Sequence, residues 1–433
     1  MGSAAATASF DVAIIGAGAA GLFCAAQAGQ RGLKVLLIDH ANKLAEKIRI
    51  SGGGRCNFTN REAGPANFLS ENPHFCRSAL SRYTAADFIA LVQRHGIAFH
   101  EKHKGQLFCD GSAEQIIRML VAECEAGQVT RWQPCQVSDA TPIAEGGGWT
   151  VHTERGEVNC ANVVIATGGL PVPKIGASDF GLRLAERLRH RIVPPRKALV
   201  PLTFVPTDWA PFVPMAGIAM PVAISTEWPA AINQRNGQRK ARRVEFLEDL
   251  LFTHRGLSGP AVLQISSHWR IGQAIHLNLL PQFDLTTVLL QAKQNSRRQL
   301  GNELGGLLTQ RLAETWLQRL AIDGSQAMPQ VPDATLRQLA TSLQDWVLTP
   351  SGTEGWSKAE VMAGGVDTRD INSQTLESKL CPGLHFIGEV VDVTGWLGGY
   401  NFQWAWSSAA ACAQAMAPSP LISVTPVAPS LTR

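Results

Sequence analysis

The feature that most constrains the fold is a glycine-rich turn near the start of the chain. It reads Gly16-Ala17-Gly18-Ala19-Ala20-Gly21 and directly follows the apolar run at residues 11–15. The run predicts a buried parallel strand, and residues 19–30 predict the helix that follows it. Glycines at this spacing allow a tight turn and let a phosphate approach the N–H groups at the helix start. The pattern predicts a dinucleotide-binding α/β fold, although a turn of this kind also occurs without a ligand.

A second strand and an acidic residue support the same interpretation. Residues 33–38 predict the strand, and Asp39 follows it, 18 residues after Gly21. An acid at this place binds the ribose hydroxyls of a dinucleotide. Because strand, turn, helix, strand and acid agree, we expect a nucleotide rather than an empty turn.

Two further glycine segments predict parts of the same site. Ile165-Ala166-Thr167-Gly168-Gly169 closes a strand-like run. Gly388-Glu389-Val390-Val391-Asp392 is followed by a second glycine-rich stretch at residues 395–403. The order and contexts of the three segments predict a single FAD site.

The chain is too long for one simple core, since it has 433 residues, and two or three lobes are expected. The predicted fold class is α/β: a Rossmann-like FAD-binding domain with a parallel sheet and a small antiparallel meander. We expect this domain at 9–193 and again at 358–417. An inserted lobe is expected at 194–357, with a proline-rich β part at 194–281 and a helical part at 282–350. The tail at 418–433 predicts disorder.

Local patterns place individual elements. Two capping boxes, Thr84 with Asp87 and Ser112 with Gln115, predict helix starts. The predicted strands are a hairpin at 97–101 and 105–109, a meander at 136–140, 149–153 and 157–160, a return to the main sheet at 162–166, and 384–387. The predicted helices cover 287–320, 334–346 and 402–416, and another begins at 258–260 and runs to 269.

Composition describes an ordinary globular protein, with 45% hydrophobic and 17% charged residues. No secretory signal is visible at residues 1–9, and the longest apolar stretch, 12–26, is too short to span a membrane. Nine cysteines without a CxxC pattern predict reduced thiols in the cytoplasm and no metal site.

The net charge is +4, and one run is strongly basic: Arg235, Arg239, Lys240, Arg242 and Arg243. Such a run is typical of a solvated loop, and it also suits RNA phosphates.

Several blocks of the sequence resemble the YhiN-type flavoproteins. They are Ile50-Ser51-Gly52-Gly53-Gly54-Arg55-Cys56-Asn57, the segment 251–260, the segment 105–110, and Gly398-Gly399-Tyr400-Asn401-Phe402 with the residues after it. The likeness extends over residues 10–415. It implies FAD bound in a split Rossmann-like domain that is interrupted by a β-barrel-plus-helix insert. Branches of the family reduce conjugated C=C bonds, oxidise amines, or make dihydrouridine in large-subunit ribosomal RNA, and the resemblance is greatest to the last branch. The basic run at 235–243 is extra relative to the family pattern.

The resemblance, together with the motifs, implies a set of FAD-binding residues. Val137 is placed at the adenine, although a buried strand residue is the simpler interpretation. Glu389 and Asp392 are placed at the flavin, with a surface role as the alternative. Asn401 is placed in a helix start that faces the flavin; a plain N-cap is the simpler interpretation, and both can hold at once. The full set is Gly16, Gly18, Ala20, Gly21, Asp39, Lys47, Gly53, Gly54, Asn57, Val137, Thr167, Gly168, Gly388, Glu389, Asp392, Gly398, Gly399, Asn401 and Phe402.

Three residues are candidates for catalysis. Cys56 could donate a proton, although most cysteines are small buried apolar residues, and Cys109 is a weaker candidate. Arg55 could polarise a substrate carbonyl. His254 could hold a phosphate or a substrate oxygen, and a structural histidine is the alternative.

The preferred functional hypothesis is a reductase that saturates a uridine of ribosomal RNA, with NADPH or NADH as the electron donor. The donor is implied by the resemblance alone. No second GxGxxG follows a strand, so we expect the donor to dock at the flavin face rather than in a Rossmann lobe of its own. The alternatives are an enone reductase or amine oxidase acting on small molecules, and a non-catalytic redox sensor. No membrane partner is expected, and the sequence does not predict an oligomeric state.

Overall fold

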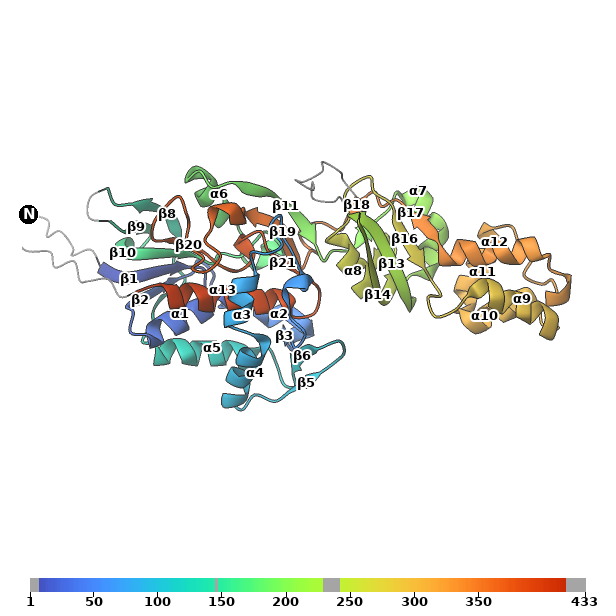
Figure 1. Cartoon of the computed structure of the whole chain (residues 1–433), viewed down its shortest axis with the longest axis horizontal. Coiled ribbons are helices and arrows are strands. Elements are labelled where there is room, and N and C mark those ends of the chain that lie inside the picture. Colours follow the sequence, from blue (N-terminus) through green and yellow to red (C-terminus); the bar gives the residue numbers. More distant parts are fainter. Residues whose placement is uncertain (1–7, 145–146, 229–241, 418–433) are drawn as a thin grey trace, which may run out of the picture. The chain divides into compact units, whose positions relative to one another are not determined.

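The computed structural model describes residues 8–144, 147–228 and 242–417 (Figure 1). The chain divides into two compact units, which are described separately. Unit 1 comprises residues 1–195 and 362–433, and unit 2 comprises residues 196–361. Within the described part of the chain, no helix is both long and apolar enough to cross a membrane. The basic run at 235–243 lies outside the described residues except at its end.

Unit 1 is built on a seven-stranded sheet with the order β7-β2-β1-β10-β9-β8, in which β20 also pairs with β10. Strands β7, β2, β1, β10 and β20 are parallel, and β9 and β8 continue as an antiparallel meander. The bounds are β1 (Ala8–Ile15), β2 (Val35–Ile38), β7 (Thr130–Trp132), β8 (Val137–Pro142), β9 (Trp149–Thr153), β10 (Gly156–Ile165) and β20 (Leu384–Phe386). The predicted strands at 157–160 and 162–166 are wrong as separate elements, because β10 runs through both: its first half pairs with β9 and its second half with β20.

The register brings the ends of the parallel strands together. Ile15 pairs with Ile38 on one side and with Ile165 on the other. Parallel strands share one carboxyl edge, so the segments after β1, β2 and β10 meet there. This edge is where ligands bind in open α/β sheets, and it unites the glycine turn with Asp39 and Thr167.

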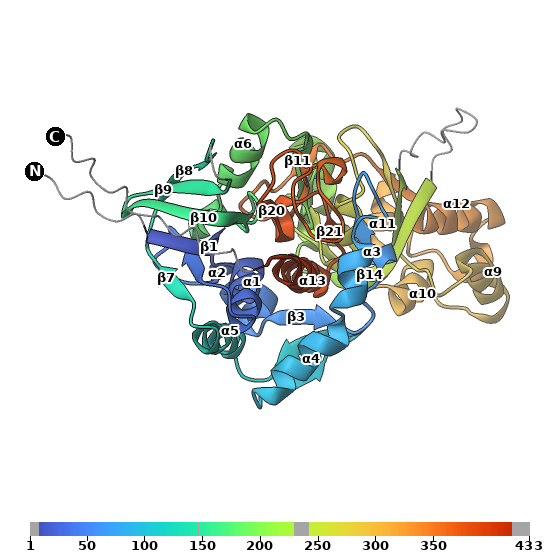
Figure 2. The same ribbon diagram turned by 60° about the vertical axis from the view of Figure 1, so that its left-hand side comes forward.

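Three helices cover one face of this sheet: α1 (Ala19–Gln30), α5 (Glu114–Ala126) and α13 (Tyr400–Ala415) (Figures 1 and 2). Helix α1 has the predicted bounds, and it packs against both α5 and α13. Helix α13 is buried along most of its length because its residues are small or aromatic. Trp406 stacks on Phe88 with ring centroids 4.3 Å apart and donates its indole N–H to the Phe58 carbonyl at 2.8 Å. The C-terminal segment is thus part of the core of the first domain.

A small three-stranded sheet adjoins α13, with the order β3-β6-β5. The predicted hairpin is confirmed as β5 (Phe99–Glu101) and β6 (Gln106–Cys109), whereas β3 (Asn57–Asn60) was not predicted. The capping box of Thr84 with Asp87 is confirmed at the start of α4. The second box is incomplete, because Gln115 accepts the Ser112 backbone N–H but α5 starts at Glu114 without a side-chain cap.

The remaining elements of unit 1 are short connectors. They are α2 (Glu46–Ile50), η1 (Ser51–Gly54), η2 (Pro65–Asn67), β4 (Phe68–Leu69), α3 (Arg77–Arg82), α4 (Ala85–Arg94), η3 (Pro173–Ile175), α6 (Phe180–Arg187), η6 (Thr368–Asp370), η7 (Gly388–Val390) and β21 (Thr394–Gly395), where η denotes a 3₁₀ turn. Strands β11 (Ile192–Ala198) and β19 (Val361–Val366) pair where the chain leaves unit 1 and returns to it.

Unit 2 contains an antiparallel seven-stranded sheet with the order β17-β16-β13-β14-β15-β12-β18 and a group of helices. The sheet occupies the region for which the resemblance implies a β-barrel. Its strands are β12 (Leu202–Thr203), β13 (Ala219–Trp228), β14 (Arg242–Phe252), β15 (Gly256–Ser258), β16 (Ile275–Asn278), β17 (Trp346–Leu348) and β18 (Gly352–Thr353). The helical elements are α7 (Pro206–Trp209), η4 (Ala210–Met215), α8 (Pro260–Ser266), α9 (Leu285–Asn295), α10 (Leu300–Leu307), α11 (Gln310–Arg319), η5 (Met328–Gln330) and α12 (Asp333–Gln344).

Two predictions for the helical part of unit 2 are wrong. The helix expected at 287–320 is three helices, because the chain turns at Ser296 and again at Leu308, where the backbone is extended. The helix expected at 334–346 ends at Gln344, and Trp346 begins β17. Trp346 lies in an aromatic core, with ring centroids 4.8 Å from Trp316 and 4.9 Å from Phe212.

Candidate functional site

The glycine turn at the carboxyl edge of unit 1 leaves room for an anion. At Gly16, φ is +106° and an added Cβ would lie 2.5 Å from the Ala166 carbonyl oxygen. At Gly21 an added Cβ would lie 1.8 Å from the Gly16 oxygen, so both positions require glycine. Gly18 is different, because no heavy atom lies within 4 Å of its added Cβ. Gly18 is also the N-cap of α1, and no side chain caps this helix start. Open space at an uncapped helix start fits a pyrophosphate.

Asp39 lies directly beside this turn. Its Oδ2 accepts the Ala17 backbone N–H at 2.5 Å, and its Oδ1 accepts that of Ala41 at 2.7 Å. The Asp39 carbonyl also accepts the Cys135 N–H at 2.7 Å, which places the chain leading into β8 next to Asp39. Val137 is the first residue of β8 and is 7% exposed. The positions predicted for ribose and adenine are therefore close together.

The segments after β10 and β20 complete the edge. Gly388 has φ +69°, and its added Cβ would lie 3.0 Å from the Ala20 Cβ, so η7 approaches the start of α1. The Gly388 carbonyl accepts the Trp404 indole N–H at 3.0 Å, which fixes η7 on α13. The Thr167 hydroxyl is buried without a hydrogen-bond partner among the described residues. A buried hydroxyl in that state is costly, and it is a group that a bound ligand can satisfy.

Lys47 and Glu389 form an ion pair across this edge. The Lys47 Nζ lies 2.5 Å from Glu389 Oε2, and Glu389 Oε1 accepts the Met362 backbone N–H at 2.8 Å. An added Cβ at Gly168 would lie 3.9 Å from the same Oε2. Both ionic partners were predicted as FAD-binding residues, but their pairing was not predicted because the two are 342 positions apart. The hydrogen bond from the Met362 backbone N–H to Glu389 was not predicted, because a backbone donor leaves no signal in the sequence.

The glycine loop and the start of α13 meet at Asn57. Gly52, Gly53 and Gly54 all have positive φ, and added Cβ atoms at Gly53 and Gly54 would meet nothing within 4 Å. The side-chain amide of Asn57 is oriented so that its nitrogen and its oxygen both have hydrogen-bond partners. In this orientation the oxygen accepts the Gly399 N–H at 3.2 Å.

Helix α13 begins beside this contact. Gly399 is its N-cap, and the first turn contains no acidic residue. Phe402 is half-buried, and its ring stacks on Trp406 with centroids 5.8 Å apart. The helix start and the glycine loop together present backbone N–H groups suited to the electron-rich edge of a flavin.

Asn401 has a different task from the predicted N-cap. It is the second residue of α13, and its side-chain amide bonds both the N–H and the carbonyl of Gly395, as well as the Trp396 carbonyl. The N-cap interpretation is wrong, because the amide reaches backwards to hold the turn before the helix. Asn401 thereby holds the turn that contains Gly398.

Asp392 is a buried carboxyl group in the same segment, with 4% of the residue exposed. Its Oδ2 accepts the Glu71 N–H at 2.8 Å and the Ser70 hydroxyl at 3.3 Å. Burial raises the pKa of Asp392 to about 6, despite these hydrogen bonds. A carboxyl group with this pKa is partly protonated near neutral pH.

The catalytic candidates lie in different surroundings. Cys56 exposes none of its side chain, and burial raises the pKa of its thiol, so it reaches a substrate only if the 51–57 loop moves. Cys109 is equally buried, and burial raises its pKa to about 11. Arg55 is exposed at the end of the glycine loop, where a guanidinium can contact a substrate.

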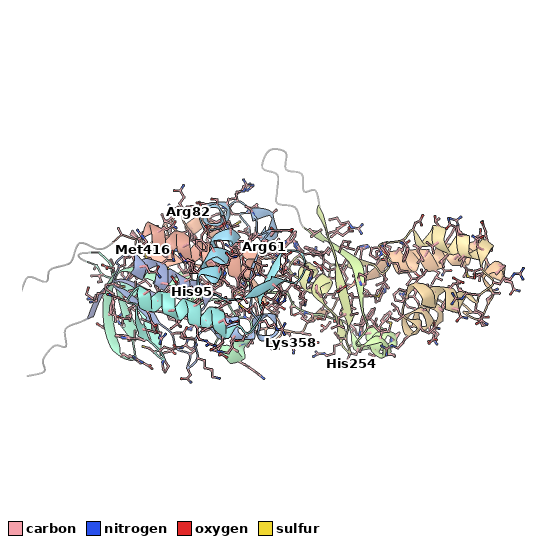
Figure 3. The ribbon with its side chains drawn as sticks, turned by 90° about the horizontal axis from the view of Figure 1, so that it is seen from below. Arg61, Arg82, His95, His254, Lys358 and Met416 are labelled. Atoms are coloured by element: carbon pink, nitrogen blue, oxygen red, sulfur yellow. The ribbon has the colours of Figure 1, made fainter. Side chains whose placement is uncertain are left out.

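His254 belongs to unit 2, where it lies in the turn between β14 and β15 (Figure 3). The helix start predicted at 258–260 is confirmed, because α8 begins at Pro260, but β15 lies between His254 and that helix start. Helix α8 starts at Pro260 and ends at Ser266, short of the predicted residue 269.

The site thus combines an open, uncapped helix start, an acid beside it and a second glycine edge that leads to another helix start. This is the construction of a Rossmann-type flavoprotein, and the chain is an FAD-dependent oxidoreductase of that class. Residues 10–415 match the family described as "HI0933-like protein Rossmann domain", and the chain belongs to this family.

Three relatives show what the chain is similar to. It is 50% identical over 414 residues to the "Ribosomal RNA dihydrouridine synthase" of Escherichia coli (strain K12), covering 94% of this chain and 97% of the relative. It is 46% identical to the protein of the same name from Haemophilus influenzae, covering 92% and 96%. It is 26% identical to the "3-dehydro-bile acid delta(4,6)-reductase" of Clostridium scindens, covering 94% and 99%.

Proposed function

We propose that this protein reduces the C5=C6 bond of a uridine in large-subunit ribosomal RNA and so forms dihydrouridine. The observation that carries the proposal is the 50% identity to a ribosomal RNA dihydrouridine synthase over nearly the full length of both chains. The relative at 26% identity reduces a carbon–carbon double bond according to its name. Reduction of C=C bonds conjugated to a carbonyl is chemistry that the two reactions have in common.

The residues of unit 1 divide the tasks of binding FAD. The start of α1 at Gly18 receives the pyrophosphate, and Asp39 receives the ribose hydroxyls. The Lys47–Glu389 pair and the backbone at Gly168 and Gly388 line the path from the nucleotide towards the flavin ring. FAD, when bound, supplies the hydride for the double bond.

The chain's own side chains orient the uracil and move the proton. The reaction adds a hydride to one carbon of the bond and a proton to its neighbour. Arg55 is exposed and donates hydrogen bonds to a uracil carbonyl, which withdraws electron density from the double bond. Cys56 remains the proposed proton donor, and this role requires the glycine loop to open. The N–H groups at the start of α13 favour negative charge at the ring edge.

NADPH or NADH is the proposed electron donor, and it docks at the flavin rather than in a domain of its own. The inserted lobe, residues 194–357, is proposed to hold the RNA, with His254 at a phosphate.

We place the reaction in the cytoplasm, a compartment that keeps cysteines as thiols. All nine cysteines of the chain are free thiols in the structure.

A second candidate is a reductase of small enones, which the Clostridium scindens relative favours. It differs from the first in one respect that can be measured: it needs no RNA and leaves RNA modification unchanged.

The deciding experiment measures dihydrouridine in ribosomal RNA by nucleoside mass spectrometry, in cells with and without the gene. Loss of dihydrouridine in the deletion, restored by the wild type but not by Gly18→Asp, supports the proposal. Gly18→Asp is chosen because a Cβ added at position 18 has no heavy atom within 4 Å, so we expect the substitution to block FAD and leave the fold intact. An unchanged dihydrouridine content in the deletion refutes the proposal and favours the enone reductase.

A further inference from the structure

Unit 1 has an open pocket of about 510 Å³ beside helix α5, outside the residues predicted to bind FAD. One wall is the loop at residues 42–44, which follows Asp39, and the other is the face of α5 from Glu114 to Glu125. We call this cavity the α5 pocket. None of the predicted FAD-binding residues lines it. Its volume is within the range of pockets that hold small ligands.

The lining combines aliphatic side chains with two cations. Ile117 is buried, and Leu44 and Val121 are half-buried. Lys43 and Arg118 are exposed, and neither side chain forms an ion pair or a hydrogen bond with another described residue. The aliphatic part suits one face of a planar base, and the two cations suit an anion.

The other charged residues of the lining do not neutralise these two cations. Arg49 bonds Glu46 at 2.8 Å and forms a second ion pair with Glu114, so it is already neutralised. Glu125 is exposed, but it follows Arg118 by seven residues, which is about 10 Å along the helix axis. Three cations and two acids therefore line the pocket, an excess of one positive charge.

The start of α5 connects the pocket to the glycine loop. Ala113 is the N-cap of α5, and its backbone N–H donates to the Gly54 carbonyl at 2.7 Å. Arg118 follows Ala113 by five residues, about 8 Å along the helix axis. We place the glycine loop at the flavin, so a ligand longer than this separation reaches from the pocket to the flavin. A nicotinamide dinucleotide is such a ligand, with adenosine at one end and nicotinamide at the other.

We propose that the α5 pocket binds the phosphorylated adenosine of NADPH and makes the protein select NADPH over NADH. The adenine lies against Leu44 and Val121, and Lys43 and Arg118 contact the 2′-phosphate. This phosphate is a monoester that carries nearly two negative charges at neutral pH, and NADH lacks it. An arginine near the ribose accommodates the same phosphate in other dinucleotide-binding folds. The inference rests on the proposed electron donor and specifies which dinucleotide serves.

The redox step that follows balances with the groups named. NADPH loses a hydride and leaves as NADP⁺, and FAD accepts that hydride together with a proton from water. An RNA strand fits the pocket less well for two reasons. No aromatic side chain on which a base could stack is among the described residues of the lining. Each phosphodiester of a strand also carries one charge, whereas two cations are available here.

The test measures binding of NADP⁺ and NAD⁺ to the FAD-loaded protein by isothermal titration calorimetry. Lys43→Gln, Arg118→Gln and the double variant remove the proposed contacts. Arg337→Gln is the control, because Arg337 is also exposed on a helix, α12 of unit 2, and does not line the pocket. The loss of flavin absorbance on mixing with NADPH or NADH, without oxygen, reports hydride transfer separately from binding.

The expected changes follow from partly exposed, charge-assisted hydrogen bonds. We expect each single variant to weaken NADP⁺ binding about fivefold, and the double variant about 20-fold. Binding of NAD⁺ should change less than about twofold in every variant, as should binding of both dinucleotides to Arg337→Gln. At saturating NADPH the rate of flavin reduction should stay the same, since the variants alter binding and not the hydride transfer itself. Adenosine 2′,5′-bisphosphate should displace NADP⁺ from the wild type.

Three outcomes overturn the proposal. Equal affinity of the wild type for NADP⁺ and NAD⁺, or equal NADP⁺ binding by the double variant and Arg337→Gln, refutes the pocket while flavin reduction and the dihydrouridine activity still stand. Displacement of NADP⁺ by a uridine-rich single-stranded RNA, but not by adenosine 2′,5′-bisphosphate, assigns the pocket to RNA. If neither dinucleotide reduces the flavin of the wild type, the proposed donor fails, and with it the pocket's role. The proposed RNA modification is decided independently, by the dihydrouridine content of the deletion.

Discussion

The sharpest prediction concerns Gly18, where stability and FAD binding should respond in opposite directions. Gly18 is the N-cap of α1 with φ −81°, a conformation open to any residue. An added side chain meets no heavy atom within 4 Å of its Cβ. Local stability therefore does not explain why glycine stands here, whereas close approach of a pyrophosphate does.

The magnitudes follow from this geometry for Gly18→Asp. Aspartate caps a helix better than glycine by a few tenths of a kcal/mol. Its charge at the helix start adds about 0.3–1 kcal/mol, and the loss of backbone freedom in the unfolded chain adds a similar amount. We expect the FAD-free protein to gain about 1 kcal/mol. In the FAD complex a carboxylate about 4 Å from a phosphate costs about 4 kcal/mol at an effective dielectric constant of about 20, or about 10³ in affinity.

The assay needs the protein stripped of FAD, with Gly18→Asn as the matched control because asparagine keeps the size and the cap but not the charge. Thermal unfolding of the FAD-free form should show a Tm about 2 °C higher for both variants. Titration with FAD should show the largest loss of affinity for the aspartate. Wild-type FAD occupancy in Gly18→Asp, or a lower Tm without FAD, would refute the placement of the pyrophosphate.

Three further perturbations test other parts of unit 1. Lys47→Met leaves Glu389 without its cation, so we expect a loss of about 1–2 kcal/mol and weaker FAD binding; a double-mutant cycle with Glu389→Gln that shows no coupling would contradict the ion pair. The folded-state pKa of Asp392 lies above its usual 3.8, so folding favours the protonated acid and stability falls as pH rises from about 4 to about 6, by about 3 kcal/mol. Urea unfolding of Asp392→Asn at several pH values should lack this component, and an unaltered pH profile would count against it. Trp406→Leu removes the stack on Phe88 and the indole hydrogen bond to Phe58, so urea unfolding should show a loss of about 3 kcal/mol; a loss below 1 kcal/mol would mean that α13 is not fixed as described.

Local signals in the sequence predicted the elements around the glycine turn well. The strand, the glycine turn and the helix at 11–30 depend on residue periodicity and on backbone freedom within a few positions. For that reason α1 has the predicted bounds, and Asp39 lies against the turn at Ala17.

Prediction failed where an element depends on distant partners. Strand β3 was missed because four residues after a glycine loop carry no periodic signal, and their pairing with β6 makes them a strand. Asn401 resembles an N-cap in the sequence, but three groups of the preceding turn are available to its amide in the folded chain. The segment between His254 and α8 was not predicted as a strand, because the short β15 is visible only through its pairing with β12 and β14.

The sequence by itself determined the class of the fold and supplied the candidate residues for FAD, because glycine spacing and apolar runs act over short distances. Only the tertiary structure decided which of these groups meet. It paired Lys47 with Glu389, buried Cys56, left Arg55 exposed, and brought Asn57 up to Gly399 at the start of α13. Those contacts join parts of the chain that are tens to hundreds of residues apart. They arise from packing a buried helix and two sheets into one core, a choice that no local pattern encodes.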